Sequence, residues 1–293
     1  MNFGQLLISG VTSGMVYGLV ALGYHIIFRA TQLIDFAQGE KVVFGGLLAL
    51  ALFSAIGDHP WLALLIVAAS GYILGWIYEL AILRPVYHRL PTVPIIATVG
   101  VAQFIYFGDG LIWGNSALPF PYSFSAEPSA AILFGAVRVP MERIWVWGLV
   151  VVAVIATALL FERSRGGQAM IAAADNQLAA QLCGINVSAM RSRAMSMATA
   201  LAMCGGLLIA PFTLAGGAIG LAITVKSFAG AMIGGLASVY GVVIGSLIVG
   251  VTESLAAGYV SYGYRDPVAF SLLLLVLLIR PEGIFGGPRL RGG

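Results

Sequence analysis

Apolar residues along the chain are grouped into long runs that short polar stretches separate. Candidate membrane segments lie at about 5–28, 42–57, 61–83, 93–113, 144–162, 194–214, 219–236, 239–258 and 266–280. A spanning helix needs roughly 20 mainly apolar residues, so the second, seventh and ninth segments are short. Glycine pairs at 45–46, 216–217 and 234–235 interrupt or flank these runs, as in broken or re-entrant helices. The pattern predicts an all-α, polytopic membrane bundle with eight or nine crossings.

Composition points in the same direction. Of the 293 residues, 60% are hydrophobic and 9% are charged, whereas a soluble domain carries roughly 25% charged residues. Such a chain has too little charge to cover a surface in water, so we expect lipid around most of it. No polar stretch is long enough for a separate soluble domain, and residues 1–293 are expected to form one transmembrane domain. The first apolar run has no basic leader and no clear cleavage site, so it is expected to stay as the first helix.

Arginines at the ends of the apolar runs predict the orientation of the chain. Arg29, Arg84 and Arg163 end the first, third and fifth runs, and the C-terminal stretch is also basic. The positive-inside rule places these ends in the cytoplasm. The N-terminus is then outside, the C-terminus is cytoplasmic, and the loop at about 114–143 is extracytoplasmic. Its stretch "PFPYSFSAEPS" suits an ordered cap on the outer face.

A water-compatible stretch at about 163–193 interrupts the second half of the chain. Apolar residues recur there with helical spacing, at Ile171, Ala174, Leu178, Leu182 and Ile185. Gly184 is typical of a helix C-cap, and a second short element then leads back into the membrane. The narrow stripe has no Trp or Phe to anchor in lipid. It therefore favours docking into a protein groove slightly over a helix that lies on the headgroups.

Polar residues at membrane depth are costly and usually face a cavity or the bundle interior. The segment "DFAQGEK" at 35–41 places Asp35, Gln38, Gly39 and Glu40 where a short helix begins, and Glu253 lies within a later apolar run. These five residues are candidates for a translocation pathway. The alternatives are an interfacial loop with a helix cap for the segment and a hydrogen-bonded structural role for Glu253.

Two further ionisable residues are expected to be structural. Glu79 lies one turn before Arg84, which indicates a structural ion pair or snorkelling to the interface. His25 lies close to Arg29 at the end of the first run, which indicates an interfacial position.

The stretch "GAMIGGLASVYGVVIGSLIVG" repeats small residues at three- and four-residue spacing. Small residues let transmembrane helices approach closely. We expect tight packing within one bundle, and a subunit interface is the alternative.

No constellation for covalent chemistry is visible in the sequence. It has no GxxxxGK[ST] phosphate loop, and the three histidines are dispersed at His25, His59 and His88. Cys183 and Cys204 do not form a CxxC pair. We predict no catalytic residue, no metal ligand and no cofactor bound by this chain. A self-sufficient channel or ion-coupled carrier and a membrane-embedded enzyme are the alternatives from other classes.

Three segments resemble the permeases of branched-chain amino-acid ABC importers. "AAADNQLAAQLCGIN" resembles their cytoplasmic coupling loop, in which two alanines precede a glycine, as Ala179, Ala180 and Gly184 do. The N-terminal "YGLVALG" run that leads to "DFAQGE", and the "RPEGIFG" ending at 280–286, resemble the two ends of the same family. The chain has Asp35 and Gln38 where the family usually shows Asn and His, so the solute is the least determined feature.

The resemblance implies the function and the partners. The chain is then a bacterial inner-membrane permease that moves branched-chain or other hydrophobic amino acids, or urea, short amides or another small solute. A second, homologous permease is expected to line the path with it, two cytoplasmic subunits hydrolyse ATP, and a soluble binding protein delivers the solute. No nucleic acid is involved. The residues that would couple to the ATPase are Asp175, Ala179, Ala180, Gln181, Gly184, Ile185 and Asn186.

Overall fold

The computed structural model describes residues 3–57, 59–87, 89–90, 92–120, 131–134, 137–213, 215–217, 219–280 and 283–286. Its apolar helices match the predicted segments: α1 (Phe3–Thr31), α2 (Gln38–Ile56), α3 (Pro60–Tyr78), α5 (Thr92–Trp113), α6 (Met141–Arg163), α9 (Val187–Ile209), α10 (Gly220–Gly234), α11 (Val239–Tyr259) and α12 (Arg265–Ile279). The shorter elements are a π-helical turn η1 (Glu79–Leu83), α4 (Arg84–Val86), α7 (Arg165–Asp175), α8 (Gln177–Leu182) and the 3₁₀ turn η2 (Tyr262–Tyr264).

Seven of the described helices are long and apolar enough to cross a membrane. They are α1, α2, α3 with its continuation to Val86, α5, α6, α9 and α11. The helices α10 and α12 have 15 residues each, which is about 22 Å of helix against a hydrocarbon core of about 30 Å. The all-α membrane bundle is confirmed, and α10 and α12 are short as predicted.

The second helix is longer than the apolar pattern indicated. It has 19 residues because α2 begins at Gln38, four residues before the apolar run. The polar residues of this first turn are buried and bonded to one another and to neighbouring helices, so they continue the helix at membrane depth.

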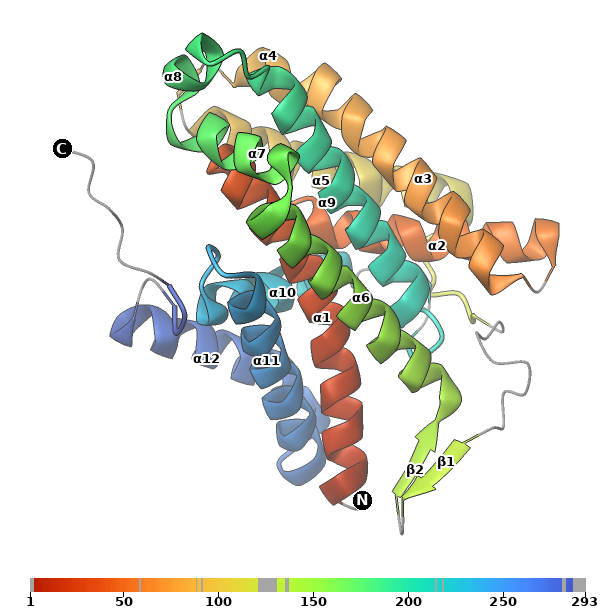
Figure 1. The fold of residues 1–293 in the computed structure, drawn as a ribbon. Helices are drawn as coiled ribbons and strands as arrows, with labels where there is room; N and C mark the ends of the chain where they lie inside the picture. Colours follow the sequence, from red (N-terminus) through yellow and green to blue (C-terminus); the bar gives the residue numbers. More distant parts are fainter. Residues whose placement is uncertain are drawn as a thin grey trace.

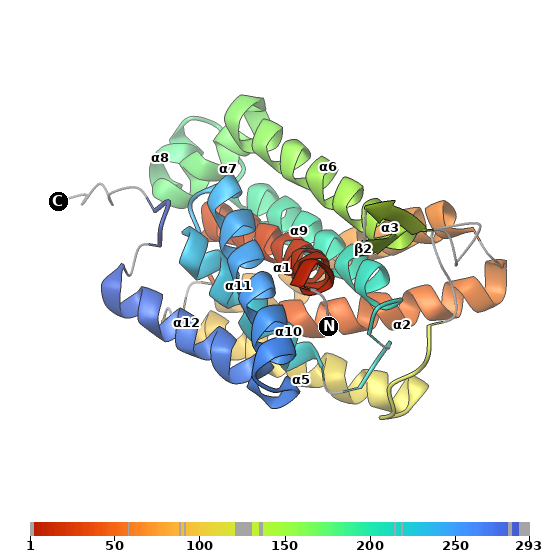
Figure 2. The ribbon, with the colours of Figure 1, turned by 90° about the horizontal axis from the view of Figure 1, so that it is seen from below.

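The first helix forms the centre of the bundle (Figure 1). It packs along α11 and α9 and is buried over most of its length. The view from below shows α6 on one face of the bundle, with α5 and α12 on the opposite face (Figure 2). The helices α7 and α8 gather at one end, opposite the N-terminus and the strands β1 and β2.

Small residues make the closest helix contacts. A Cβ atom added to Gly250 of α11 would overlap the backbone of Gly14 in α1. A Cβ atom on Gly245 would likewise overlap Gly230 and Gly234 of α10. The glycine-rich stretch therefore packs against helices of the same chain, which confirms the expected use of small residues.

One feature of the fold was not predicted. The strands β1 (Ala131–Phe134) and β2 (Val137–Pro140) form an antiparallel pair before α6, with Ala131 opposite Pro140. Four-residue strands are too short to show a clear alternation of polar and apolar residues. Most of the expected outer cap, at 121–130, lies outside the described residues, as do Arg289 and Arg291 of the basic C-terminal stretch used for the orientation. His88, one of the three dispersed histidines, also lies outside them.

Candidate coupling and translocation sites

Three side-chain caps define the coupling segment, by which we mean residues 163–193. The Ser164 Oγ, Asn176 Oδ1 and Asn186 Oδ1 atoms accept hydrogen bonds from backbone N–H groups three residues ahead, each at 3.0 Å. These caps begin α7, α8 and α9 in turn, and each satisfies a donor that the first helical turn leaves free. Gly184 has φ of 80° in the turn before α9, which confirms the predicted glycine turn.

Two details of this segment differ from the prediction. The sequence pattern predicts one helix up to Gly184, but the chain breaks at Asn176, whose backbone is extended. Asparagine bonds nearby backbone groups outside helical conformations, so it favours a cap over a helix interior. The second short element expected after Gly184 is the start of α9, which continues unbroken from Val187 to Ile209.

The candidate coupling residues differ in exposure. Asp175, Ala179, Gln181, Gly184 and Asn186 are exposed, and Ile185 is half-buried. Ala180 is only 4% exposed and packs against α7 and α9, so its side chain supports the segment from within.

The predicted apolar stripe is not buried as one face. Leu178 is 69% exposed and Leu182 is 81% exposed, although both lie on a helix that joins the bundle. Two leucines side by side on an exposed turn form a surface suited to a partner helix or groove.

A buried ion pair organises the segment 35–41 where α2 begins. The Lys41 Nζ atom lies 2.5 Å from Asp35 Oδ2 and 3.4 Å from Gln38 Oε1. Tyr78 of α3 donates its hydroxyl to Asp35 Oδ1 at 3.2 Å, and its ring lies under the ammonium of Lys41. Asp35 and Gln38 are fully buried, so the structure places both inside the bundle.

Two neighbouring helices hold the backbone of the same segment. The N–H of Phe36 donates to Thr98 Oγ1 of α5, and the N–H of Gly39 donates to Thr224 Oγ1 of α10. Non-helical backbone within a membrane requires such partners. The segment 35–41 is therefore a junction of α2, α3, α5 and α10.

Two carboxylates near this junction lack partners. Glu40 is 8% exposed and Asp109 of α5 is 6% exposed. The Glu40 Oε2 and Asp109 Oδ2 atoms have no hydrogen-bond partner among the described residues. Buried acceptors without donors are uncommon in folded proteins, so this place can accept a cation or a hydrogen-bond donor.

Glu253, the fifth candidate for the pathway, is bonded on several sides. It accepts a hydrogen bond from Tyr17 at 3.0 Å and lies 2.9 Å from Lys226 Nζ and 2.8 Å from Arg265 Nε. Lys226 also contacts Asp266 at 2.7 Å. This network ties α1, α10, α11 and α12 together, and it supports the structural alternative for Glu253.

Glu79 takes part in an ion pair, but not with its near neighbour Arg84. The carboxylate accepts a hydrogen bond from Ser192 at 2.5 Å and lies 4.0 Å from Arg191 Nε. Arg191 also stacks on the ring of Tyr87, 3.9 Å from its centroid. Glu79 begins the π-helical turn, a distortion frequent at functional sites, and it links α3 to the start of α9.

His25 is buried inside the bundle, in the part of α1 that also carries Arg29. It is 1% exposed, and its Nδ1 atom lies 2.8 Å from the carbonyl oxygen of Leu236. Its ring meets that of Phe161 edge-on. The N-terminal region of α11 and the end of α6 cover this part of α1, so the histidine has no exposure to solvent.

Comparison with known proteins decides the family of this chain. Residues 6–280 match the family model described as the permease component of the branched-chain amino acid transport system. The chain belongs to this permease family. It is 31% identical to the high-affinity branched-chain amino acid transport system permease protein LivH of Salmonella typhimurium, over 98% of this chain and 97% of LivH.

Two further comparisons accompany this match. The high-affinity branched-chain amino acid transport system permease protein BraD of Pseudomonas aeruginosa is 29% identical over 98% of this chain and 97% of its own length. The solved structure of PsaBC from Streptococcus pneumoniae in complex with Fab aligns with 96% of this chain and 93% of that chain, at 16% identity and a TM-score of 0.49. The family assignment rests on the family model and on LivH.

The permease contains polar contacts that sequence reasoning missed. Neither Asp109 nor Lys226 was among the candidate site residues predicted from the sequence. Their distances along the chain, 69 residues from Glu40 to Asp109 and 27 from Lys226 to Glu253, leave no local periodic signal. The available clue was that Asp109 and Lys226 are charged residues within apolar runs.

Proposed function

We propose that this permease imports branched-chain amino acids, with leucine, isoleucine and valine as its solutes. The match of residues 6–280 to the family model and the identity to LivH over nearly the whole chain carry this proposal. The alignment with LivH covers 98% of this chain and 97% of LivH.

ATP hydrolysis is assigned to separate subunits because the sequence has no phosphate loop. Two cytoplasmic ATPases bind the permease and its permease partner, and a soluble binding protein delivers the amino acid to the outer face. Closure of the ATPase pair shifts the permease between two states that open to opposite sides. This chain binds no cofactor and catalyses no covalent step.

The coupling segment provides the contact surface for the ATPase. Leu178, Ala179, Gln181 and Leu182 of α8 are exposed, and α8 joins the start of α9 through the Gly184 turn. Movement of α8 would reach α3 through the contact of Ser192 with Glu79.

The segment 35–41 is connected to the Ser192–Glu79 contact through the neighbouring residue Tyr78. Tyr78 precedes Glu79 in the chain and donates to Asp35, so α3 connects the coupling segment with the start of α2. Two-state rearrangement of this junction would open or close the solute path.

The unpartnered carboxylates give the path its chemistry. Glu40 and Asp109 present acceptor oxygens beside the junction, and every amino acid carries an ammonium group with three donors. A charge-assisted hydrogen bond to these carboxylates would hold the ammonium during passage. Among the five candidates named from the sequence, Glu40 is therefore the residue that we propose to line the path.

The proposed location is the bacterial inner membrane, with the N-terminus outside and the coupling segment and C-terminus in the cytoplasm. Labelling of an Asn176→Cys variant tests this orientation, after Cys183 and Cys204 are replaced by serine. A maleimide that does not cross the membrane should label it in inside-out vesicles and leave it unlabelled in intact cells. Labelling in intact cells would reverse the topology.

Uptake of radiolabelled leucine tests the solute. Cells that lack this chain should lose high-affinity leucine uptake and regain it with the wild-type permease. Excess isoleucine or valine should compete, whereas urea should not. If urea suppressed leucine uptake and isoleucine did not, the permease would belong among transporters of other small solutes.

A further inference from the structure

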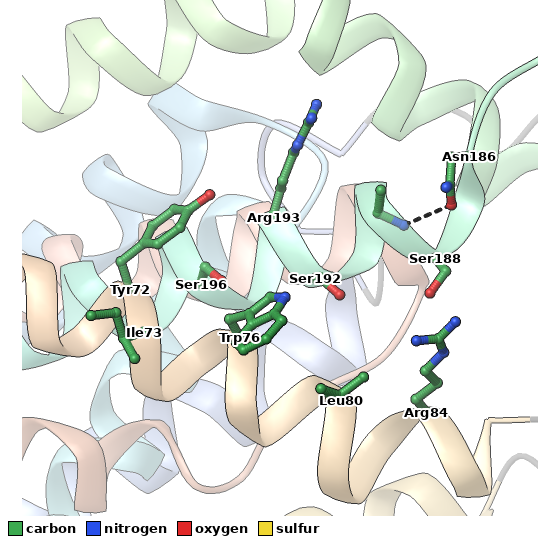
Figure 3. A pocket seen from close by; sticks show the side chains of 11 residues that line it. Tyr72, Ile73, Trp76, Leu80, Arg84, Asn186, Ser188, Ser192, Arg193 and Ser196 are labelled. Atoms are coloured by element: carbon green, nitrogen blue, oxygen red, sulfur yellow. Dashed lines mark hydrogen bonds between the residues drawn. The ribbon is translucent and has the colours of Figure 1, made fainter.

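A second binding site lies on the outside of the bundle, between α3 and α9. A cavity of about 530 Å³ is bounded by these helices and the turns that extend α3. Figure 3 shows Tyr72, Ile73 and Trp76 rising from α3 toward the serines of α9, with Arg84 beside Ser188 and Asn186. The cavity does not include the segment 35–41 or the carboxylates Glu40 and Asp109.

The two ends of this cavity differ in chemistry. Its α8 end carries the exposed guanidinium of Arg84, next to Asn186 and Ser188 at the start of α9. Arg193, one turn further along α9, is also exposed and lines the cavity. Neither arginine has an ion-pair partner in the described part of the chain, and none of the lining residues is acidic.

The other end is apolar and aromatic. Ile73 is 56% exposed and Trp76 is 49% exposed on the face of α3 that bounds the cavity. Tryptophan and tyrosine are enriched where a membrane meets water. At the bottom of this end, Ser196 is fully buried and its Oγ atom has no hydrogen-bond partner among the described residues. A ligand that combines a negative head with an apolar tail fits both ends.

We propose that this cavity binds an anionic phospholipid from the leaflet on the α7–α8 side. The phosphate group binds the guanidinium of Arg84 beside Ser188, since a guanidinium binds phosphate in a bidentate manner, and the exposed Arg193 adds positive charge to the same surface. The acyl chains run along Ile73 and Trp76 toward the membrane centre. Basic pockets between transmembrane helices on the cytoplasmic side are suited to such headgroups. The headgroup then contacts Asn186, the cap of α9, so the lipid supports the coupling segment from its membrane side.

Lipid retention by the full-length chain tests this inference. The protein, with any subunits that it retains, is placed in nanodiscs of equal phosphatidylglycerol and phosphatidylcholine, and retained lipid is counted by native mass spectrometry. The wild type should retain phosphatidylglycerol preferentially, and Arg84→Gln/Arg193→Gln should lower this preference by roughly tenfold. The conservative Arg84→Lys/Arg193→Lys variant should keep most of it. Nanodiscs present the same lipids on both faces, so the result depends neither on the proposed orientation nor on the transported solute.

The control variant Arg163→Gln/Arg165→Gln removes the same charge from exposed positions on the same side of the bundle and should retain the lipid like the wild type. Equal retention by the wild type and Arg84→Gln/Arg193→Gln would overturn the proposal. So would binding of inorganic phosphate to lipid-free protein with the same dependence on both arginines, which would identify a soluble anion site. Unchanged lipid retention with loss of the ATPase or of the partner permease would assign the cavity to a subunit contact.

Discussion

At the scale of single residues, buried polar groups of this permease fall into two kinds. Asp35 and Lys41 satisfy each other, and Glu253 is bonded to Tyr17 and Lys226. Glu40 and Asp109 keep an oxygen free. The first kind holds helices together, and the second kind is available for a solute. Conservative substitutions of the first kind should therefore lower the stability of the fold, whereas those of the second kind should lower transport and leave the fold intact.

Substitution of Glu40 should impair transport and leave the fold intact. Glu40→Gln keeps the shape of the side chain but removes its charge, so the ammonium of the solute loses a charge-assisted hydrogen bond. We expect leucine uptake to fall by about tenfold or more. The matched control is Glu162→Gln, since Glu162 is exposed at the end of α6. Equal uptake by Glu40→Gln and the control, at equal protein level, would exclude Glu40 from the path.

The Asp35–Lys41 pair should behave as a coupled unit. Asp35→Asn or Lys41→Met leaves one buried charge without its partner, at a cost of about 3–5 kcal/mol. The double substitution removes both charges and should recover a large part of that loss. Thermal unfolding in detergent measures the three variants. Losses that simply add in the double variant would show that the two side chains do not stabilise each other.

At the scale of elements, the coupling segment combines a rigid support with an exposed edge. Ala180 packs inward with Met170 and Ala173, while Leu178 and Leu182 face outward. A substitution at Ala180 would disturb the fold of the segment, so the outward leucines are the sharper test of a docking surface.

Leu178→Asp/Leu182→Asp should release the ATPase. Charged groups would replace apolar contact area, and we expect co-purified ATPase to fall by roughly tenfold or more, since buried leucine contacts contribute about 1.5–3 kcal/mol each. Membrane insertion should be unchanged because neither side chain is buried in the bundle. Leu90→Asp, at a leucine that is 74% exposed outside the coupling segment, is the control. Full ATPase retention by the double variant would move the docking surface elsewhere.

The contact of α1 with α11 depends on the absence of side chains. Gly14→Leu would place a large group against the backbone of α11 and should cost about 1–3 kcal/mol or prevent assembly of the bundle. Gly148→Leu is the matched control, because nothing lies within 4 Å of a Cβ at Gly148. Size-exclusion profiles and thermal stability should separate the two variants. Equal stability would mean that α1 and α11 do not pack this closely.

The sequence alone was sufficient to predict those features of the fold that depend on a local pattern of residues. Apolar runs located the nine main helices, and Gly184 located the turn before α9. The polar first turn of α2 escaped the pattern because Asp35 and Gly39 find their partners Tyr78 and Thr224 only after the bundle has formed. The contact of Glu79 with α9 likewise depends on a tertiary partner, Ser192. The pairing of charges across helices is not encoded at any fixed spacing.

At the scale of the whole molecule, polar contacts join the coupling segment to the membrane interior. They run from Ser192 on α9 to Glu79, and from the adjacent Tyr78 to Asp35 where α2 begins. A permease with an external source of energy needs such a link, because force applied at α8 has to change the surroundings of the solute. A channel or an ion-coupled carrier would not need the exposed α8 surface.

Leucine uptake into proteoliposomes tests this account most directly. The liposomes contain either the complete complex, with its ATPases and partner permease, or the purified permease chain alone. With leucine-loaded binding protein outside, we predict uptake only by the complete complex, and only when the ATPase side has hydrolysable ATP. Uptake by the chain alone, or by the complex without ATP, would contradict the claim that separate ATPases drive this permease.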